Sequence, residues 1–225
     1  MKILITGMSG FVGTALASGL EERHRIVGTF YSGSVKPGKS RAVRLDLGKR
    51  DDINRLLVDE SPDLVVHCAA MSKVPQCESD QEAAGKINTR AAGLVAAAAS
   101  HVGSGLIYLS TDLVFDGRKG MYREDDKPCP LSRYAETKLL GEDASRSECT
   151  GTIVARLALC YGWGPRPEMS FTHWMIGELE QGRRVKVFTD QYRTPLYVGA
   201  MAGIVEKLVE RGVEGETYHM ADRTE

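Results

Sequence analysis

The 225-residue chain lacks several features that would place it in a specialised class of protein. Its five cysteines are scattered and form no C-x-x-C pair, which argues against a disulfide framework and a zinc site. No run approaches the ~20 apolar residues of a membrane span, and the first apolar stretch is too short for a signal peptide. The net charge of −1, without a basic stripe, disfavours nucleic acid. We therefore expect a cytoplasmic protein without membrane, nucleic-acid or metal partners.

What the chain does contain is an ordinary globular composition, with short apolar runs that alternate with longer helical stretches. This alternation predicts a parallel sheet covered on both faces, and right-handed crossovers then give a doubly wound, Rossmann-type α/β fold. Strands are predicted at Lys2–Thr6, Arg25–Phe30, Ala42–Leu47, Asp63–Ala70, Gly105–Phe115, Thr152–Cys160 and Val185–Thr189. Helices are predicted at Phe11–Glu22, Asp51–Glu60, Ser79–Val102, Arg133–Ser147, Ser170–Gln181 and Gly199–Arg211, with Ser79 as a plausible cap.

A glycine-rich turn, Gly7–Gly13, has the spacing G-x-x-G-x-x-G directly after the first strand and at the start of the first helix. In this context the glycines allow a tight turn and a close approach of the backbone to a pyrophosphate. The helix N-terminus adds unpaired N–H groups and a partial positive charge. The alternative is a purely structural turn. As a dinucleotide site, the turn would use Gly7, Ser9, Gly10, Phe11, Val12 and Gly13.

The end of the second predicted strand bears on the choice of dinucleotide. An acidic residue there would accept hydrogen bonds from the adenosine ribose and repel a 2′-phosphate. This chain has Thr29–Ser32 instead, and Lys36, Lys39 and Arg41 follow. NADP(H) is therefore favoured and NAD(H) permitted, with Ser32 as a cofactor contact. The alternative is that these basic residues only solvate a loop.

Tyr134 and Lys138 stand four residues apart on a predicted helix and so share one face. A lysine ammonium beside a tyrosine favours the phenolate, so we expect the pKa of Tyr134 to be lowered from about 10. Thr111 lies in the C-terminal half of the fifth strand, and in open parallel sheets chemistry occurs beyond the carboxyl ends of the strands. These three residues are the candidate catalytic group.

The whole chain resembles the extended short-chain dehydrogenase/reductase superfamily, and within it the dTDP-4-dehydrorhamnose reductase-like (RmlD-like) branch. The stretches that carry the resemblance follow the family's order along nearly all of the sequence. They are Gly7–Gly13, Asp46-Leu47, His67–Ala70, Ile87-Asn88, Ser110–Gly117, Tyr134–Lys138 and Asp190–Pro195.

The resemblance implies a reductase that transfers a hydride from a nicotinamide to a ketone carbon of a nucleotide-linked 4-keto sugar. Thr111 would orient the carbonyl, Tyr134 would donate the proton, and Lys138 would also hold the nicotinamide ribose. Asp46 and Leu47 match a segment that contacts adenine, and Ala69 and Ala70 match the strand end beside the cofactor. The residues implied at the sugar end are Thr111, Asp112, Leu113, Trp163 and Phe171.

The chain departs from the branch in places. Leu113 stands where members of the branch commonly have tyrosine, which leaves the identity of the substrate open. Ala135 stands in place of the glycine that usually follows the catalytic tyrosine. The sequence also ends earlier than family members usually do, which indicates a C-terminal truncation or an unusually open site. We expect residues 1–160 to form the NAD(P)-binding Rossmann domain and 161–225 a smaller substrate-binding portion. The alanines of Ala91–Ala99 suit close helix packing or a homodimer interface.

Two other functions fit the same resemblance. One is a nucleotide-sugar epimerase or dehydratase, which would keep its cofactor tightly bound. Leu113 stands where a dehydratase would want glutamate, which argues against that reaction. The other is a non-catalytic NADP-binding regulatory subunit like the beta subunit of methionine adenosyltransferase, because a shared fold does not fix function.

Overall fold

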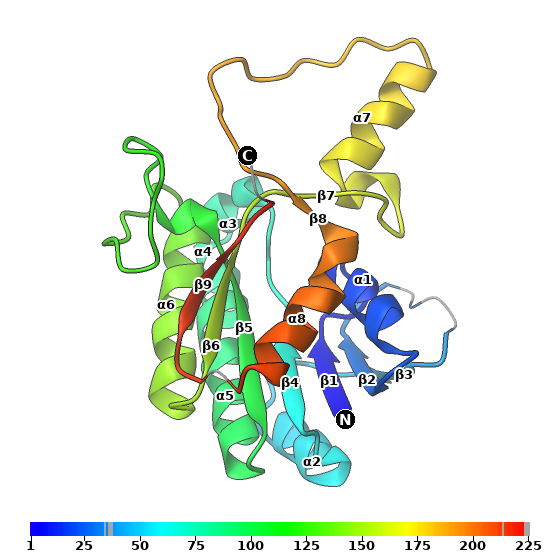
Figure 1. Cartoon of the computed structure of the whole chain (residues 1–225), viewed down its shortest axis with the longest axis vertical. Helices are drawn as coiled ribbons and strands as arrows, with labels where there is room; N and C mark the ends of the chain where they lie inside the picture. The colour runs from blue at the N-terminus through cyan, green and yellow to red at the C-terminus, as the bar shows by residue number, and fades with distance from the viewer. Residues whose placement is uncertain (34, 36–37, 213, 223–225) are drawn as a thin grey trace.

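The computed structural model describes residues 1–33, 35, 38–212 and 214–222, and within these residues a seven-stranded parallel sheet is the central layer (Figure 1). The strand order is β3-β2-β1-β4-β5-β6-β9, and it reverses between β1 and β4. This is the doubly wound arrangement, so the predicted fold class is confirmed. The strands are β1 (Lys2–Thr6), β2 (Arg25–Phe30), β3 (Arg41–Arg44), β4 (Leu64–His67), β5 (Gly105–Thr111), β6 (Ile153–Leu157) and β9 (Thr217–Met220).

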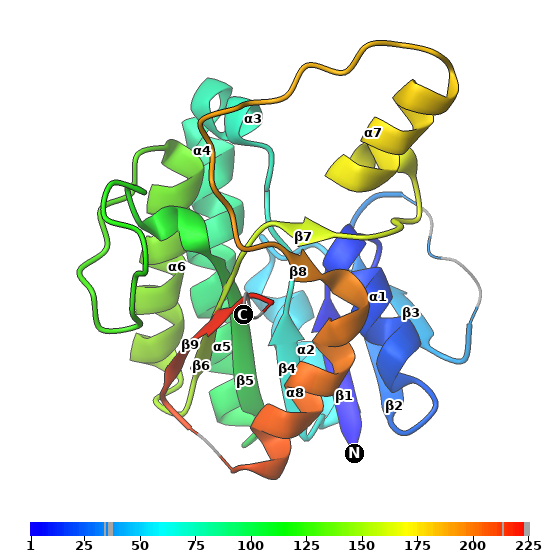
Figure 2. The same ribbon diagram turned by 45° about the horizontal axis from the view of Figure 1, so that its top comes forward.

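Helices cover both faces of this sheet (Figure 2). One face carries α1 (Phe11–Leu20) and α8 (Met201–Glu210), which pack against each other. The opposite face carries α2 (Arg50–Glu60), α5 (Ala91–His101) and α6 (Arg133–Glu148). No helix among the described residues combines the length and the apolar character needed to cross a membrane.

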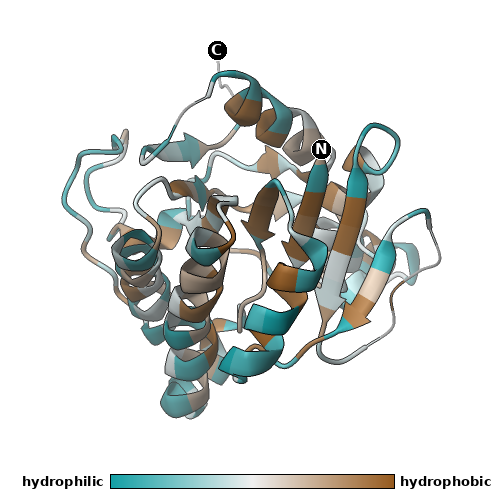
Figure 3. Cartoon of the chain, turned by 90° about the horizontal axis from the view of Figure 1, so that it is seen from below, coloured by the Kyte–Doolittle hydropathy of each residue, from teal (hydrophilic) through white to brown (hydrophobic). Residues whose placement is uncertain are grey.

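The alternation of side chains along each strand builds two apolar cores. In β1, Ile3 and Ile5 belong to the core under α1 and α8, whereas Leu4 belongs to the core under α2 and α5. Figure 3 shows the apolar residues concentrated on the strands and on the helix faces turned toward them. The alanines of Ala91–Ala99 are mostly buried within the molecule, so close packing against α6 and the sheet accounts for them.

The predicted helix over Ser79–Val102 is broken into shorter elements. It consists of α3 (Val74–Ser79), α4 (Gln81–Ala84), the π-helical turn η1 (Gly85–Arg90) and then α5. Asp80, not Ser79, caps α4, because its Oδ1 accepts a hydrogen bond from the Ala83 N–H at 2.9 Å. The π-helical turn places Asn88 inside the fold, where its side chain bonds Met71 and Thr137.

Several strands are shorter than predicted. The fifth strand ends at Thr111 because the Thr111 hydroxyl accepts the Leu113 N–H at 3.2 Å and begins the 3₁₀ turn η2 (Asp112–Val114). The sixth ends at Leu157, and a separate strand β7 (Cys160–Tyr161) then pairs with β8 (Leu196–Tyr197). The strand predicted at Val185–Thr189 is wrong. These residues belong to the described part of the chain, are largely exposed and form no strand.

The part of the chain after residue 160 is divided between the sheet and a projecting segment. Figure 1 shows η3 (Pro167–Met169), α7 (Phe171–Glu180) and the segment after it standing away from the sheet. The chain then returns through β8 and the turn η4 (Val198–Ala200) to α8 and β9. A boundary at residue 160 therefore does not follow the sheet, because β9 pairs with β6 and α8 packs on α1.

Candidate functional site

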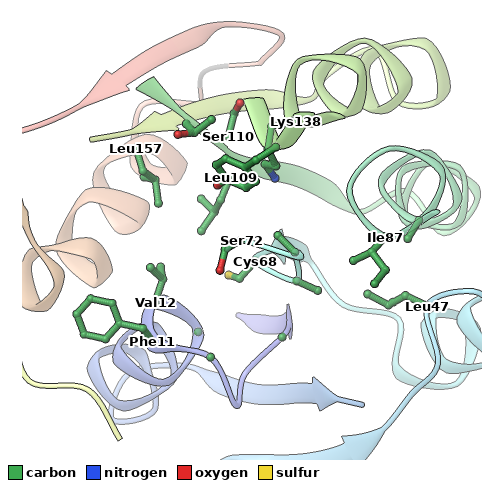
Figure 4. Close-up of a pocket in the computed structure, with 18 of the residues that line it drawn as sticks. Phe11, Val12, Leu47, Cys68, Ser72, Ile87, Leu109, Ser110, Lys138 and Leu157 are labelled. Carbon is green, nitrogen blue, oxygen red and sulfur yellow. The ribbon is translucent and has the colours of Figure 1, made fainter. Parts of the chain in front are cut away.

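A cavity of about 810 Å³ opens at the carboxyl ends of the strands (Figure 4). It runs from the turn after β1, past the ends of β4 and β5, to α6 and the end of β6. Every residue that the sequence predicted as a cofactor contact lines this cavity. They are Gly7, Ser9, Gly10, Phe11, Val12, Gly13, Ser32, Asp46, Leu47, Ala69, Ala70, Tyr134 and Lys138.

The glycine turn is shaped by close backbone approaches. Gly7 has a φ of +69°, and a Cβ at this position would lie 2.7 Å from the Cα of Ala69. Gly10 is the N-cap of α1 and contributes no side-chain cap, so the first N–H groups of the helix have no side-chain acceptor at the cavity wall. Such a helix start is suited to an anion such as a pyrophosphate.

The end of β2 forms one rim of the cavity. The Ser9 hydroxyl donates to the Ser32 carbonyl at 3.3 Å, and Arg44 donates through Nε to the Tyr31 carbonyl at 3.2 Å. The two basic residues that the sequence linked to NADP are engaged elsewhere, because Lys39 pairs with Glu22 and Arg41 with Glu60. Lys36, the third, lies outside the described residues.

The far end of the cavity is apolar, with Leu47 and Ile87 facing each other in Figure 4. Asp46 folds back on its own turn, where its Oδ1 accepts the Gly48 N–H at 2.9 Å. Near the centre, the Thr6 hydroxyl accepts the N–H groups of Cys68 and Ala69 at 3.1 and 3.2 Å. These bonds fix the wall on which Ala69 and the adjoining Ala70 lie.

Thr111, Tyr134 and Lys138 come from two distant segments and line the same cavity. Ser132 starts α6 by accepting the Ala135 N–H at 3.2 Å, and this sets Tyr134 in the first turn of the helix. The Thr111 hydroxyl, which accepts the Leu113 N–H at 3.2 Å, lies near enough to the Tyr134 phenol to affect its pKa. The structure therefore brings together the phenol, the amine and the alcohol that the sequence selected.

The electrostatics of this group correct the prediction about the phenol. Burial raises the pKa of Tyr134 to about 12, although the neighbouring Thr111 hydroxyl opposes the shift. Burial lowers the pKa of Lys138 to about 7, against the charge of Glu142. Near neutral pH the phenol is thus fully protonated, as a proton donor must be.

The residues implied at the sugar end are only partly gathered. Asp112 and Leu113 line the cavity, and Asp112 forms an ion pair with Arg193 at 3.2 Å. Trp163 and Phe171 do not line it. They lie beside and on α7 with 65% and 44% of their surfaces exposed.

Other residues that line the cavity were not predicted from the sequence. Arg193 reaches the cavity from the segment between α7 and β8, which has no periodic pattern that would have placed it. Cys160 and Leu157–Leu159 lie at the end of β6, and the rule that sites form at the carboxyl ends of strands could have found them. Tyr108 lies beneath Lys138, and the amine is 4.0 Å from the centroid of its ring. This contact joins β5 to α6, and the sequence of neither segment predicts it.

The family model described as the RmlD substrate binding domain matches residues 1–225. A probable low-salt glycan biosynthesis reductase, Agl14 of Haloferax volcanii, is 34% identical over 229 residues, which cover 100% of this chain and 75% of that protein. The beta subunit of methionine adenosyltransferase 2 from Bos taurus is 31% identical over 212 residues, covering 93% of this chain but only 62% of the relative.

Among solved structures, a dTDP-4-dehydrorhamnose reductase from Bacillus anthracis in complex with NADP superposes with a TM-score of 0.83 at 27% identity. The match covers 99% of this chain and 75% of that one. The chain thus spans between about three fifths and three quarters of the length of these three proteins.

Proposed function

Because the chain belongs to the RmlD substrate binding domain family, we propose that it is an NAD(P)H-dependent reductase of a nucleotide-linked 4-keto sugar. The observation that carries the proposal is the convergence of Thr111, Tyr134 and Lys138 on the cavity that begins at the glycine turn. The similar dTDP-4-dehydrorhamnose reductase from Bacillus anthracis was solved in complex with NADP. The similarity of Agl14, a probable reductase, supports the same class of reaction.

The cavity fits an extended dinucleotide. The start of α1, with Gly10 at its N-cap, would receive the pyrophosphate, and the apolar end at Leu47 would receive the adenine. Ser32 at the β2 rim would lie near the adenosine ribose, and the absence of an acid beside it favours NADP(H) over NAD(H). Ala69 and Ala70 would lie beside the cofactor. When bound, a reduced nicotinamide supplies the hydride.

The residues of the chain perform the proton chemistry. The Thr111 hydroxyl holds the substrate carbonyl beside Tyr134, since both side chains line the cavity. As the carbonyl carbon receives a hydride, the O–H bond of Tyr134 breaks and its proton passes to the carbonyl oxygen, which gives the alcohol. The Lys138 amine, buried beneath the same wall, holds the cofactor ribose and stabilises the phenolate that remains.

The sugar end of the cavity lies under the segment that follows β6. Asp112 and Leu113 border it from the sheet, and Arg193 borders it from the projecting segment. We assign the substrate-binding portion to residues 161–197, because β9 belongs to the sheet and α8 packs on α1. Trp163 and Phe171 lie in this segment but do not line the cavity.

One experiment separates this reductase from the alternatives. The purified chain is mixed with NADPH and a panel of dTDP-, UDP- and GDP-linked 4-keto sugars, and the absorbance of the reduced cofactor is followed with product analysis. We expect one panel member to be reduced to the alcohol with one NADPH consumed for each sugar. An isomerised sugar without net consumption of NADPH would indicate an epimerase. Tight NADPH binding with no turnover and a stable protein partner would indicate a regulatory subunit.

A further inference from the structure

The amine of Lys138 is held in an unusual way for a buried cation. The side chain is 2% exposed, and no hydrogen bond or ion pair of its Nζ is formed within the described part of the chain. A buried lysine normally needs a partner for its charge. Here the nearest interaction is aromatic, because Nζ lies 4.0 Å from the ring centroid of Tyr108.

Tyr108 is itself fully buried and contacts Lys138 at two points. Its ring lies under the amine, and its hydroxyl donates to the Lys138 backbone carbonyl at 3.2 Å and to the Asn88 carbonyl at 3.3 Å. A cation 4.0 Å over the face of a ring is well inside the range of a cation–π interaction, which strengthens when both groups are removed from water.

Gly141 keeps the ring in this position. A Cβ on residue 141 of α6 would lie 2.2 Å from the Tyr108 hydroxyl and 2.5 Å from the Asn88 carbonyl oxygen. Only a glycine lets α6 approach the π-helical turn closely enough for the Tyr108 hydroxyl to sit between them. The position of the ring is therefore set from the side opposite the cavity.

The Tyr108 ring also stacks on a neutral neighbour. His67 lies against it, with ring centroids 5.7 Å apart and an interplanar angle of 24°. Burial lowers the pKa of His67 to about 3, so its imidazole is neutral near pH 7 and does not compete with the lysine as a cation. Burial also raises the pKa of Tyr108, which keeps the phenol neutral.

We infer that Tyr108 is a positioning residue for the proposed reduction: its ring face holds the ammonium of Lys138 at the cavity wall where the cofactor ribose would bind. The inference rests on the proposed function for its role in turnover, but the contact itself can be tested without a substrate. The remaining titratable groups near the amine are Glu142 on α6, His67 in β4 and Cys68 after it.

The test compares Tyr108→Phe with the same position carrying pentafluorophenylalanine, which keeps the shape of the ring and reverses the polarity of its face. The titration of Lys138 is followed by NMR of carbon-13-labelled lysine side chains, and Lys138→Met assigns the signal. We expect Tyr108→Phe to titrate as the unmodified protein does. We expect the fluorinated ring to lower the titration midpoint by about one pH unit, because it repels the ammonium.

Phe115 provides a matched control, because its ring lies 5.2 Å from the Arg156 guanidinium and does not line the cavity. Pentafluorophenylalanine at position 115 should leave the Lys138 midpoint unchanged. Equal midpoints for the two rings at position 108 would overturn the inference, and so would an equal shift from position 115. If Tyr108→Phe lowered the Lys138 titration midpoint as much as the fluorinated ring does, the effect would come from the loss of the hydroxyl. That result would also overturn the inference.

Turnover adds an independent readout. If the proposed reduction occurs, the alkaline limb of kcat/KM should move to lower pH by the same amount in the fluorinated variant. If no sugar is reduced, the proposed function fails while the lysine titration still decides the role of Tyr108.

Discussion

The backbone carbonyl of Gly7 occupies the space that a side chain at residue 13 would need. A Cβ built on Gly13 would lie 2.4 Å from that oxygen, which no real Cβ could tolerate without a shift of the backbone. The third glycine of the turn is therefore required by the packing of helix α1 on the turn, and this same packing aims the helix start at the cavity.

We predict that Gly13→Ala opens this turn. The affinity for NADPH should fall at least about tenfold, and the free energy of unfolding should fall by about 1–3 kcal/mol, the usual effect of overpacking. Fluorescence titration with NADPH and urea unfolding measure the two effects. Gly203→Ala is the control, because Gly203 lies in α8 with open space where the added methyl group would lie, and there alanine should be neutral or stabilising. Unchanged NADPH affinity in Gly13→Ala would refute the assigned role of the turn.

A buried ion pair behind the site should dominate local stability. Arg156 donates to Glu142 through Nη2 at 2.8 Å and through Nε at 3.1 Å, and both side chains are nearly inaccessible. Glu142→Gln leaves the guanidinium buried without a counter-charge, so the free energy of unfolding should fall by about 3 kcal/mol.

The matched control for this prediction is Glu136→Gln on the same helix. Glu136 pairs with Arg133 at 2.7 Å, but it is half exposed, so its loss should change stability by no more than about 0.5 kcal/mol. Urea unfolding of the two variants at neutral pH makes the comparison. Equal losses of stability in the two variants would mean that burial does not determine how much the Glu142–Arg156 pair contributes to stability.

The buried imidazole of His67 should make the protein sensitive to acid. Burial and the Lys138 ammonium lower its pKa from 6.5 to about 3, so between these values the unfolded chain binds a proton that the folded chain does not. Stability must then fall as pH drops from 6.5 toward 3, by up to ~1.4 kcal/mol per pH unit.

Urea unfolding between pH 6 and pH 4 measures this dependence. The slope of stability against pH should be smaller in His67→Gln by about the contribution of one proton, whereas His101→Gln, at an exposed site, should keep the slope of the unmodified chain. Identical slopes in all three proteins would show that His67 is not neutral in the fold.

How much of this could be read from the sequence depends on the range of the interactions. The turn Gly7–Gly13 and the pairing of Tyr134 with Lys138 depend on local spacing, and the structure puts all of these residues at one cavity. The direction of the Tyr134 pKa shift was mispredicted, because a helix pattern shows which residues are neighbours but not how deeply they are buried.

The contacts between elements that are distant in the sequence could not be predicted from the sequence. Tyr108 reads as one more apolar residue of a buried strand, and only the close approach of α6 at Gly141 turns its ring toward Lys138. The break in the helix at Asp80 and the π-helical turn at Asn88 depend on side-chain bonds to Met71 and Thr137, which lie elsewhere in the chain.

Arg193 should matter for substrate and not for cofactor. It is paired with Asp112 at the sugar end of the cavity, where the diphosphate of a nucleotide sugar would bring negative charge. Arg193→Gln should raise the KM for the sugar about tenfold and leave the Kd for NADPH unchanged.

The control for Arg193 is Arg183→Gln in the same projecting segment. Arg183 is paired with Glu178 on α7 and does not line the cavity, so its loss should change neither constant. Steady-state kinetics with saturating NADPH and a separate binding titration provide both values. A rise in the Kd for NADPH, with KM unchanged, would place Arg193 at the wrong end of the site.

The most direct test of the account is the rate of NADPH oxidation by Tyr134→Phe on the sugar that the unmodified chain reduces. The variant keeps the ring and loses the hydroxyl group that carries the proton, so kcat should fall by roughly 10²–10⁴-fold while the Kd for NADPH stays within about threefold. A variant that reduces the sugar at the rate of the unmodified chain would contradict the claim that Tyr134 donates the proton.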